Sequence, residues 1–390
     1  MGVAAHADAA AVDGLRPRET VRTASEGEVV DAIRGANERG EAMVIAGGGT
    51  RIGVGDPPTR YDLSLELSAL RGIVAYEPDD LVSTVRAGTT IAELAAALAP
   101  RGQRWPIEPG FPERATVGGT FASAAGGPSR LRYFHPRDWV IGARVVLGDG
   151  TLVRSGGRVV KNVTGYDLTR LWSGTFGTLA AIVELTLKLT AVPRRTVTLL
   201  AELDVAAAIA AARELHASGL PLDALAIVTG EPVSAVGAHG EAALLVRIAG
   251  AAPAVRRLGR DVRERVRCRD VANEVWERIA ALPLEAKWAA RAAWPAAARP
   301  EIEFAGYDAV IYPGTSTTFL LRAIDRAVFR KVRASLEAAG GLAVLERASV
   351  DYKRDVGGAW GTSRVPIAIA RALKQRFDPR GVLAPGRMPS

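Results

Sequence analysis

The segment VIAGGGTRIGVGDP, residues 44–57, joins a short apolar run to a loop that contains three consecutive glycines. The apolar run predicts a β-strand, and the glycines after it allow positive φ and close approach of the backbone. Successive backbone N–H groups in such a loop can converge on an anion, so the segment is a candidate phosphate cradle. For the glycines alone, a tight turn between two strands is the more common interpretation.

Spacing excludes the two commonest nucleotide-binding motifs. A P-loop requires G-x-x-x-x-G-K-[ST], whereas the next lysine after the loop is Lys161. The dinucleotide fingerprint G-x-G-x-x-G also fails, because Ile52 stands where its third glycine belongs. A phosphate ligand would therefore need a different backbone arrangement.

The composition is that of a globular protein. The chain has 390 residues, of which 48% are hydrophobic and 24% charged, so neither disorder nor a fibrous class is indicated. This length allows about two to three domains. The apolar runs are well short of the ~20 residues that a membrane helix needs, and the first ten residues lack the charged start of a secretory signal. We therefore expect a cytoplasmic protein.

Charge and cysteine content exclude further classes. The formal net charge is +8, but 44 of the 50 basic residues are arginines scattered among acidic neighbours, as in RRLGRDVRERVRCRD. Such a pattern is typical of solvated helix faces and argues against nucleic-acid binding. A single cysteine, Cys268, excludes a disulfide framework and cannot supply the four thiolates of a typical iron–sulfur cluster. Any such cluster must belong to a partner.

Local patterns divide the chain into regions. Residues 18–190 predict an α+β domain with subdomains at about 18–60 and 61–190, since one helix and strand are followed by short β-branched runs separated by turns. The local signals are two capping boxes and one hairpin turn: Ser25 with Glu28, Thr90 with Glu93, and Asp149-Gly150.

The proline-containing segment TAVPRRT, residues 190–196, predicts a domain boundary. Residues 197–340 read as strand, helix, two strands and several Ala/Arg helices, which indicates a second, α/β domain without catalytic spacing. After a helix expected at about 365–377, the tail RFDPRGVLAPGR is dense in turn formers, so we expect this tail to have a role in the structure. Residues 1–17 are expected to be a flexible N-terminus.

A second glycine cluster lies in EPGFPERATVGGTFASAAGGPSRLRYFHPRD, residues 108–138. Thr116, Gly118 and Gly119 precede a small-residue helix start, and Gly126-Gly127 follow, so a flat ring could approach the bare backbone. Arg130 and Arg132 nearby could donate to anionic or carbonyl oxygens. Together with SGTFGTLAAIVEL, the two clusters favour one long cofactor that contains phosphate.

The ordered set of motifs resembles a known family. The GGGT loop, YEPDDLVSTVRAGTTIAEL, ATVGG, VIGARVVLGDGTLVRSG, GTFGTLAAIVELTLKL and the terminal FDPRGVLAPGR resemble the PCMH-type FAD-binding flavoproteins of the vanillyl-alcohol oxidase superfamily. Within it, the chain is most similar to the E-subunit family of glycolate oxidases. The resemblance implies a two-subdomain FAD-binding domain at 18–190, an α/β cap domain at 197–340, and a segment at 341–390 that returns to pack on the FAD domain.

The resemblance also implies a noncovalent FAD site. The diphosphate would lie on Gly47, Gly48, Gly49, Thr50, Arg51, Ile52 and Gly53, and the ribityl chain and ring on Thr116, Gly118, Gly119, Gly126 and Gly127. Further contacts would come from Pro109, Ser123 and Arg132, and those near the adenine end from Gly177 and Ile182. The chain has Ala124 and Gly126 where the family leads us to expect asparagine and serine, and Ala180 where it leads us to expect glycine. Covalent relatives use a histidine or cysteine near the loop, and neither is present there.

No catalytic base and no metal site are predicted. The four histidines are His6, His135, His216 and His239, whereas the resembling D-2-hydroxy-acid dehydrogenases place a histidine-rich metal site in the second domain. Isolated histidines are more often surface residues than ligands. His135 lies beside the expected flavin-lining segment but could equally be a turn residue, and Lys161 and Tyr166 fit a structural loop.

Three functions stay open. The first is the FAD-carrying subunit of a glycolate (2-hydroxy acid) oxidase complex, with a sister FAD subunit that holds the substrate site. An iron–sulfur subunit would pass the electrons on, and membrane association would be peripheral, through these partners only. The second is a self-sufficient FAD oxidase or dehydrogenase of a small hydroxy acid or alcohol. The third is a non-catalytic scaffold.

Overall fold

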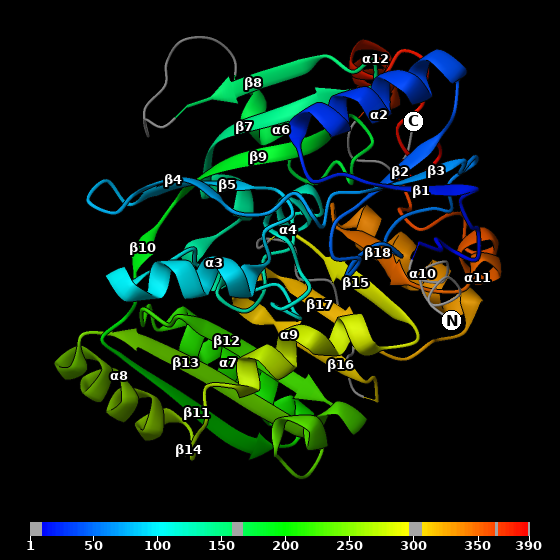
Figure 1. Cartoon of the computed structure of the whole chain (residues 1–390). Helices are drawn as coiled ribbons and strands as arrows, with labels where there is room; N and C mark the ends of the chain where they lie inside the picture. The colour runs from blue at the N-terminus through cyan, green and yellow to red at the C-terminus, as the bar shows by residue number, and fades with distance from the viewer. Residues whose placement is uncertain (1–9, 158–166, 296–305, 363–365, 389–390) are drawn as a thin grey trace, which may run out of the picture. The chain divides into compact units, whose positions relative to one another are not determined.

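The computed structural model describes residues 10–157, 167–295, 306–362 and 366–388. Contacts divide the chain into two compact units (Figure 1). The first unit comprises Met1–Ala125, His135–Ala191 and Ser363–Ser390, and the second comprises Gly126–Phe134 and Val192–Thr362. Each unit has its own sheets and cores.

The first unit opens with a small parallel sheet. Strands β1 (Glu19–Arg22), β3 (Leu63–Glu66) and β2 (Met43–Ala46) lie in that order, and helix α2 (Glu26–Arg39) connects β1 to β2. The Ser25 hydroxyl accepts a hydrogen bond from the Glu28 N–H, which confirms the expected helix start. Gly40 ends α2 in the left-handed conformation that favours glycine. Because β3 pairs with β1 and β2, this subdomain extends beyond the expected limit at residue 60.

An antiparallel sheet of five strands is the larger sheet of the first unit. Its strand order is β4 (Ile73–Glu77), β5 (Val82–Arg86), β9 (Ala180–Lys188), β7 (Val140–Leu147) and β8 (Leu152–Gly156). The expected hairpin joins β7 to β8, with Gly150 at a φ of 83°. The remaining elements are β6 (Gln103–Arg104), β10 (Thr190–Ala191), α3 (Ile91–Leu98), α4 (Val117–Ala122), α6 (Leu168–Leu171) and α12 (Ile367–Phe377), with short 3₁₀ turns at 99–101 and 136–138. These elements give the α+β class expected from the sequence.

Strand β9 separates two cores of this unit. Ala181 and Val183 pack into a cluster with α2 and the parallel sheet. Ala180 and Ile182 belong to a second cluster that includes side chains of α3 and α4. Successive side chains of a strand point to opposite faces, so the apolar run of β9 is buried on both sides.

Residues near both termini contact strand β2. Leu383 forms a parallel bridge with Met43, and the Met43 N–H donates to the Val382 carbonyl at 2.7 Å. Val12 is fully buried in a cluster with Val44 and Ala384. Residues 10–17, expected to be part of a flexible terminus, therefore include a buried anchor.

The second unit is built on one antiparallel sheet of eight strands. Their order is β14 (Arg269–Val271), β11 (Arg195–Leu203), β13 (Ala242–Gly250), β12 (Ala224–Thr229), β16 (Ala309–Tyr312), β17 (Thr317–Leu320), β15 (Ala289–Ala293) and β18 (Leu342–Arg347). The helices are α5 (Arg130–Tyr133), α7 (Val205–Ala217), α8 (Ala252–Arg265), α9 (Val275–Glu285), α10 (Arg326–Ala338) and α11 (Val350–Asp355), with 3₁₀ turns at 231–236 and 313–315. The expected order of strand, helix and two strands corresponds to β11, α7, β12 and β13.

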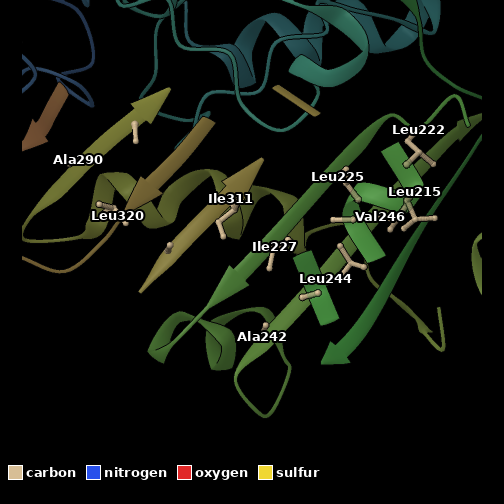
Figure 2. Close-up of a cluster of buried hydrophobic side chains, with 14 of the residues drawn as sticks. Leu215, Leu222, Leu225, Ile227, Ala242, Leu244, Val246, Ala290, Ile311 and Leu320 are labelled. Carbon is tan, nitrogen blue, oxygen red and sulfur yellow. The ribbon is translucent and has the colours of Figure 1, made fainter. Parts of the chain in front are cut away.

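Helices cover both faces of this sheet. Leu244 and Val246 of β13 point into the larger core, shown in Figure 2, with side chains of α7, α8 and α10. Leu245, between them, packs on the opposite face with Trp276 and Ile279 of α9. Burial on both faces explains why β13 reads as a nearly continuous apolar run.

The second unit extends further along the chain than expected. Strand β18 pairs with β15, which places residues 341–362 here and not with the C-terminal segment. Residues 126–134 also belong to this unit, because Arg247 forms an ion pair with Asp223 at 2.7 Å and donates to the Ser129 hydroxyl at 2.5 Å. All three side chains are buried.

Candidate functional site

A cavity lies in the first unit at the carboxyl end of β2. It contains about 780 Å³ of empty space, open solvent at its mouth included. Its walls come from the glycine loop, α4 and its N-cap, the turn before β9 and the C-terminal tail. The lining residues are Val44–Ile52, Leu67, Ala87, Thr116, Gly118, Gly119, Ala122, Ser123, Phe176, Gly177, Ala180, Ile182 and Arg387.

Two loop glycines are required by packing. A Cβ atom on Gly47 would lie 2.4 Å from Oγ1 of Thr116. A Cβ atom on Gly48 would lie 1.6 Å from the carbonyl oxygen of Arg114. The loop backbone therefore lies directly against residues 114–116, with no space for a side chain.

The same loop presents backbone donors to the cavity. Among the described residues, no partner is found for the N–H groups of Gly47, Gly48, Gly49 and Thr50, which are all partly exposed. Gly49 has a φ of 71°, and a Cβ atom there would meet nothing within 4 Å. Consecutive N–H groups around a residue with positive φ form the kind of concavity that binds anions.

Residues 117–119 of the second glycine cluster lack such donors. The N–H groups of Val117 and Gly118 donate to the carbonyls of Thr89 and Ala87, both at 2.9 Å. The Gly119 N–H donates to Oγ1 of Thr116 at 3.1 Å. Residues 117–119 can therefore contribute surface to a ligand, but their N–H groups are already engaged.

The charged residues in the cavity wall are both basic. Arg51 comes from the glycine loop and Arg387 from the C-terminal tail, and no acidic residue is found among the described lining residues. Arg387 is only 2% exposed. Burial lowers the pKa of Arg387, while Asp13, Tyr61 and Asp56 act in the opposite direction. An anionic group would reduce the electrostatic cost of this buried cation.

The rest of the wall is largely apolar. Leu67, Ala87 and Ile182 line it together with Phe176 and Ala180. The combination of N–H donors, two arginines and an apolar surface suits a ligand that joins phosphates to flat rings. The residues present therefore fit a dinucleotide.

Most residues expected to contact the cofactor line this one cavity: Gly47, Gly48, Gly49, Thr50, Arg51, Ile52, Thr116, Gly118, Gly119, Ser123, Gly177 and Ile182. Gly53 and the buried Pro109 are not among the lining residues. Gly126, Gly127 and Arg132 belong to the second unit, where Arg132 donates to the Ala249 carbonyl at 3.0 Å. The role of these residues in cofactor binding stays a prediction.

Several lining residues, Phe176 and Arg387 among them, were not predicted from the sequence. Phe176 has a φ of 50°, which is unusual for a residue other than glycine, and it lies inside the motif GTFGT. For Arg387, the density of turn formers in the tail was the available signal, but this signal pointed to a segment and not to a side chain.

The described part of the chain contains no candidate metal centre. No group of three or more His, Cys, Asp or Glu residues that could hold a metal is found there. Cys268 is partly buried, and burial raises the pKa of its thiol. Lys161 and Tyr166 lie outside the described residues, as does His6. In the part of the chain that was searched, no helix is sufficiently long and apolar to cross a membrane.

Comparison with known proteins identifies the family. A family model described as an FAD-binding domain matches residues 17–156. Over 353 residues, the chain is 31% identical to glycolate oxidase subunit GlcE of Escherichia coli strain K12, and this match covers 89% of the chain and 92% of the relative. The chain belongs to the PCMH-type FAD-binding flavoproteins. The resemblance inferred from the motifs is confirmed.

Another curated relative matches a smaller share of this flavoprotein. Glycolate oxidase subunit GlcD of Bacillus subtilis is 33% identical over 185 residues, which is 47% of this chain and 39% of the relative. Among solved structures, p-cresol methylhydroxylase aligns with a TM-score of 0.67 at 15% identity over 94% of this chain and 88% of that one. Alkyldihydroxyacetonephosphate synthase aligns with a TM-score of 0.64 at 17% identity, covering 95% and 77%. At these identities, the two structures support the fold alone.

The cofactor of this flavoprotein is FAD, and the chain is an FAD-dependent oxidoreductase. The cavity in the first unit lies within the part of the chain that carries the family match, apart from Phe176, Gly177, Ala180, Ile182 and Arg387. Its donors and charge fit the diphosphate of FAD, and its apolar wall fits the rings.

Proposed function

We propose that this chain is the FAD-carrying subunit of a complex that oxidises glycolate or a related 2-hydroxy acid. The observation that carries the proposal is the match to GlcE, because it extends over nearly the full length of both chains. The matches to 2-hydroxy-acid enzymes such as D-lactate dehydrogenase of Archaeoglobus fulgidus are limited to 43% of this chain and 38% of the relative.

In this proposal, the glycine loop holds the cofactor diphosphate. The N–H groups of residues 47–50 would donate to it, and Arg51 and Arg387 would offset its charge. Leu67, Ile182 and the other apolar lining residues would exclude water from the rings. FAD, when bound, supplies a two-electron acceptor for the oxidation. We expect it to be bound noncovalently, since neither histidine nor cysteine is among the described residues that line the cavity.

The composition of the cavity wall supports a need for partners. Oxidation of a hydroxy acid requires a base that accepts the hydroxyl proton. The described lining residues include no histidine, carboxylate, lysine or tyrosine. A sister FAD subunit would supply the substrate site, and an iron–sulfur subunit would accept the electrons. Membrane association, if the complex uses a membrane acceptor, would be through these partners.

A second candidate is a self-sufficient dehydrogenase of a D-2-hydroxy acid. It is favoured by a 35% identity to D-2-hydroxyglutarate dehydrogenase of Xanthomonas citri pv. viticola, higher than that to GlcE. This chain spans only 35% of that relative. The shared part is thus the smaller part of that enzyme, which makes this candidate the weaker one.

Co-purification tests the proposal. The chain carrying an affinity tag is expressed with its candidate flavoprotein and iron–sulfur partners, and the eluate is assayed for subunits, FAD and glycolate-dependent dye reduction. We expect a complex that contains all three subunits and has activity absent from each subunit alone. A chain that elutes alone from these co-expressions and has full activity would favour the self-sufficient dehydrogenase.

A further inference from the structure

The C-terminal tail is fastened to the first unit by a buried charge cluster. The Asp378 carboxylate is buried and accepts hydrogen bonds from the N–H groups of Val382 at 3.0 Å and Leu383 at 2.8 Å. The ammonium group of Lys374 pairs with Asp378 and donates to the carbonyls of Leu383 at 2.6 Å and Thr178 at 2.7 Å. We call residues 378–388 the C-terminal clasp.

The clasp then follows the strand that leads into the glycine loop. Strand β2 is at the edge of its sheet, and residues 382–384 lie along its open side. The Ala384 N–H donates to the Met43 carbonyl at 2.7 Å, in addition to the bond from Met43 to Val382. Residues 382–384 of the clasp therefore extend the three-stranded sheet like a fourth strand, beside β2, which leads into the glycine loop.

At its far end, the clasp holds the loop itself. The guanidinium of Arg387 donates to the Ile52 carbonyl at 2.7 Å and also to the Val54 carbonyl. The Thr59 N–H donates to the Pro385 carbonyl at 2.9 Å. A buried cation that bonds to two loop carbonyls restrains the backbone of the same loop, whose residues 47–50 line the cavity and have N–H groups with no partner among the described residues.

We propose that Arg387 is a positioning residue for the cofactor diphosphate, and that docking of the C-terminal clasp and binding of a diphosphate-containing ligand stabilise each other. This inference rests on the proposed role of the glycine loop in FAD binding. Arg387 fixes the loop through its carbonyls and adds positive charge to the cavity wall, so both effects favour the bound anion. By linkage, the ligand must in turn favour the docked clasp.

The effect of an Arg387 substitution on different ligands distinguishes a role in diphosphate binding from a role in fold stability alone. A clasp that only stabilises the fold would affect every ligand of the cavity equally. A clasp that organises the diphosphate site affects FAD and ADP, which contain a diphosphate, and leaves riboflavin, which has none, unaffected.

Binding measurements on the full chain test the proposed role of Arg387 in diphosphate binding. FAD and riboflavin affinities are measured by flavin fluorescence and ADP affinity by calorimetry, for the wild type, Arg387→Met, Arg387→Lys and the control Arg380→Met. Arg380 is an exposed residue of the same clasp and does not line the cavity. We expect Arg387→Met to weaken FAD and ADP binding by about tenfold or more, Arg387→Lys to be intermediate, and riboflavin binding to stay within about twofold. We expect Arg380→Met to match the wild type.

Hydrogen exchange provides a second measurement on unmodified protein. We expect ADP to slow amide exchange in residues 378–388 of the wild type, and riboflavin to have no such effect. Equal ADP affinity of the wild type and Arg387→Met, or unchanged exchange in the clasp when ADP binds, would overturn this inference while leaving FAD binding intact. Failure of the wild type to bind either FAD or ADP would overturn the FAD site as well. If Arg387→Met does not fold, Arg387→Lys and the exchange measurement decide.

Discussion

Gly48 packs so closely against Arg114 that a Cβ atom would lie 1.6 Å from the Arg114 carbonyl oxygen. Packing alone therefore requires glycine at position 48, whether or not a ligand is bound. The loop backbone lies directly on residues 114–116, and the same glycines line the cavity. Close packing and phosphate binding are thus compatible roles for the GGG sequence.

We expect Gly48→Ala to destabilise the flavin-free protein by about 3 kcal/mol or more, because backbone must move to admit the methyl group. Gly49→Ala is the matched control, since its Cβ atom would meet nothing within 4 Å. Its cost should be only about 1 kcal/mol, from the positive φ. Urea unfolding measures both. Equal stability of the two variants would show that the loop is not packed as described.

Ala124→Gly should stabilise the protein. Ala124 has a φ of 53°, a region that disfavours residues with a Cβ atom, and the family resemblance leads us to expect asparagine there, which tolerates this conformation. Removal of the Cβ atom should add about 0.5–1 kcal/mol to the free energy of unfolding. A loss of stability in urea unfolding would mean that the methyl group contributes more through packing than it costs in strain.

The capping box of α3 makes stability depend on pH. Oγ1 of Thr90 accepts from the Glu93 N–H at 3.1 Å, and the Glu93 carboxylate accepts from the Thr90 N–H at 2.8 Å. That backbone bond lowers the pKa of Glu93 from 4.5, aided by the Thr90 hydroxyl and Arg71. Thr90→Ala should cost about 1 kcal/mol at pH 7.

Glu93→Gln isolates the charge of this capping box. A carboxylate with a lowered pKa stabilises the fold above its unfolded pKa, and this contribution is lost as the pH falls through the folded pKa. The stability difference between the wild type and Glu93→Gln should therefore be present at pH 7 and shrink as the pH falls below 4.5. A difference that is constant in urea unfolding across this range would exclude a role for the charge.

Noncovalent binding predicts that acid precipitation releases the flavin. The supernatant should be yellow and contain intact FAD by chromatography, since no histidine or cysteine is among the described lining residues of the cavity. A yellow pellet with a colourless supernatant would demonstrate a covalent link.

Local structure was largely predictable because it depends on neighbouring residues. The Thr90–Glu93 box, the Asp149-Gly150 hairpin and the Ser25 cap were all found as expected. The loop of residues 47–52 was also expected at the site, since its glycines and the preceding apolar run are adjacent in sequence.

Long-range contacts explain what the sequence did not reveal. Arg387 meets Ile52 across 335 positions, and Arg132 meets Ala249 across 117. One of 44 arginines cannot be singled out when its partners are backbone carbonyls, which are the same at every residue. The place of residues 126–134 in the second unit was not foreseen for a similar reason, since the buried pair of Asp223 and Arg247 that contacts Ser129 has no local signature.

Anaerobic addition of glycolate or D-lactate to the isolated, FAD-loaded chain tests the central claim most directly. The flavin absorbance near 450 nm is followed alone and after addition of the partner subunits, with dithionite as the control for a reducible flavin. A chain that carries FAD but needs partners for substrate oxidation should stay yellow alone and lose its colour only in the complex. Bleaching of the isolated chain within seconds of substrate addition would contradict the account and establish a self-sufficient dehydrogenase.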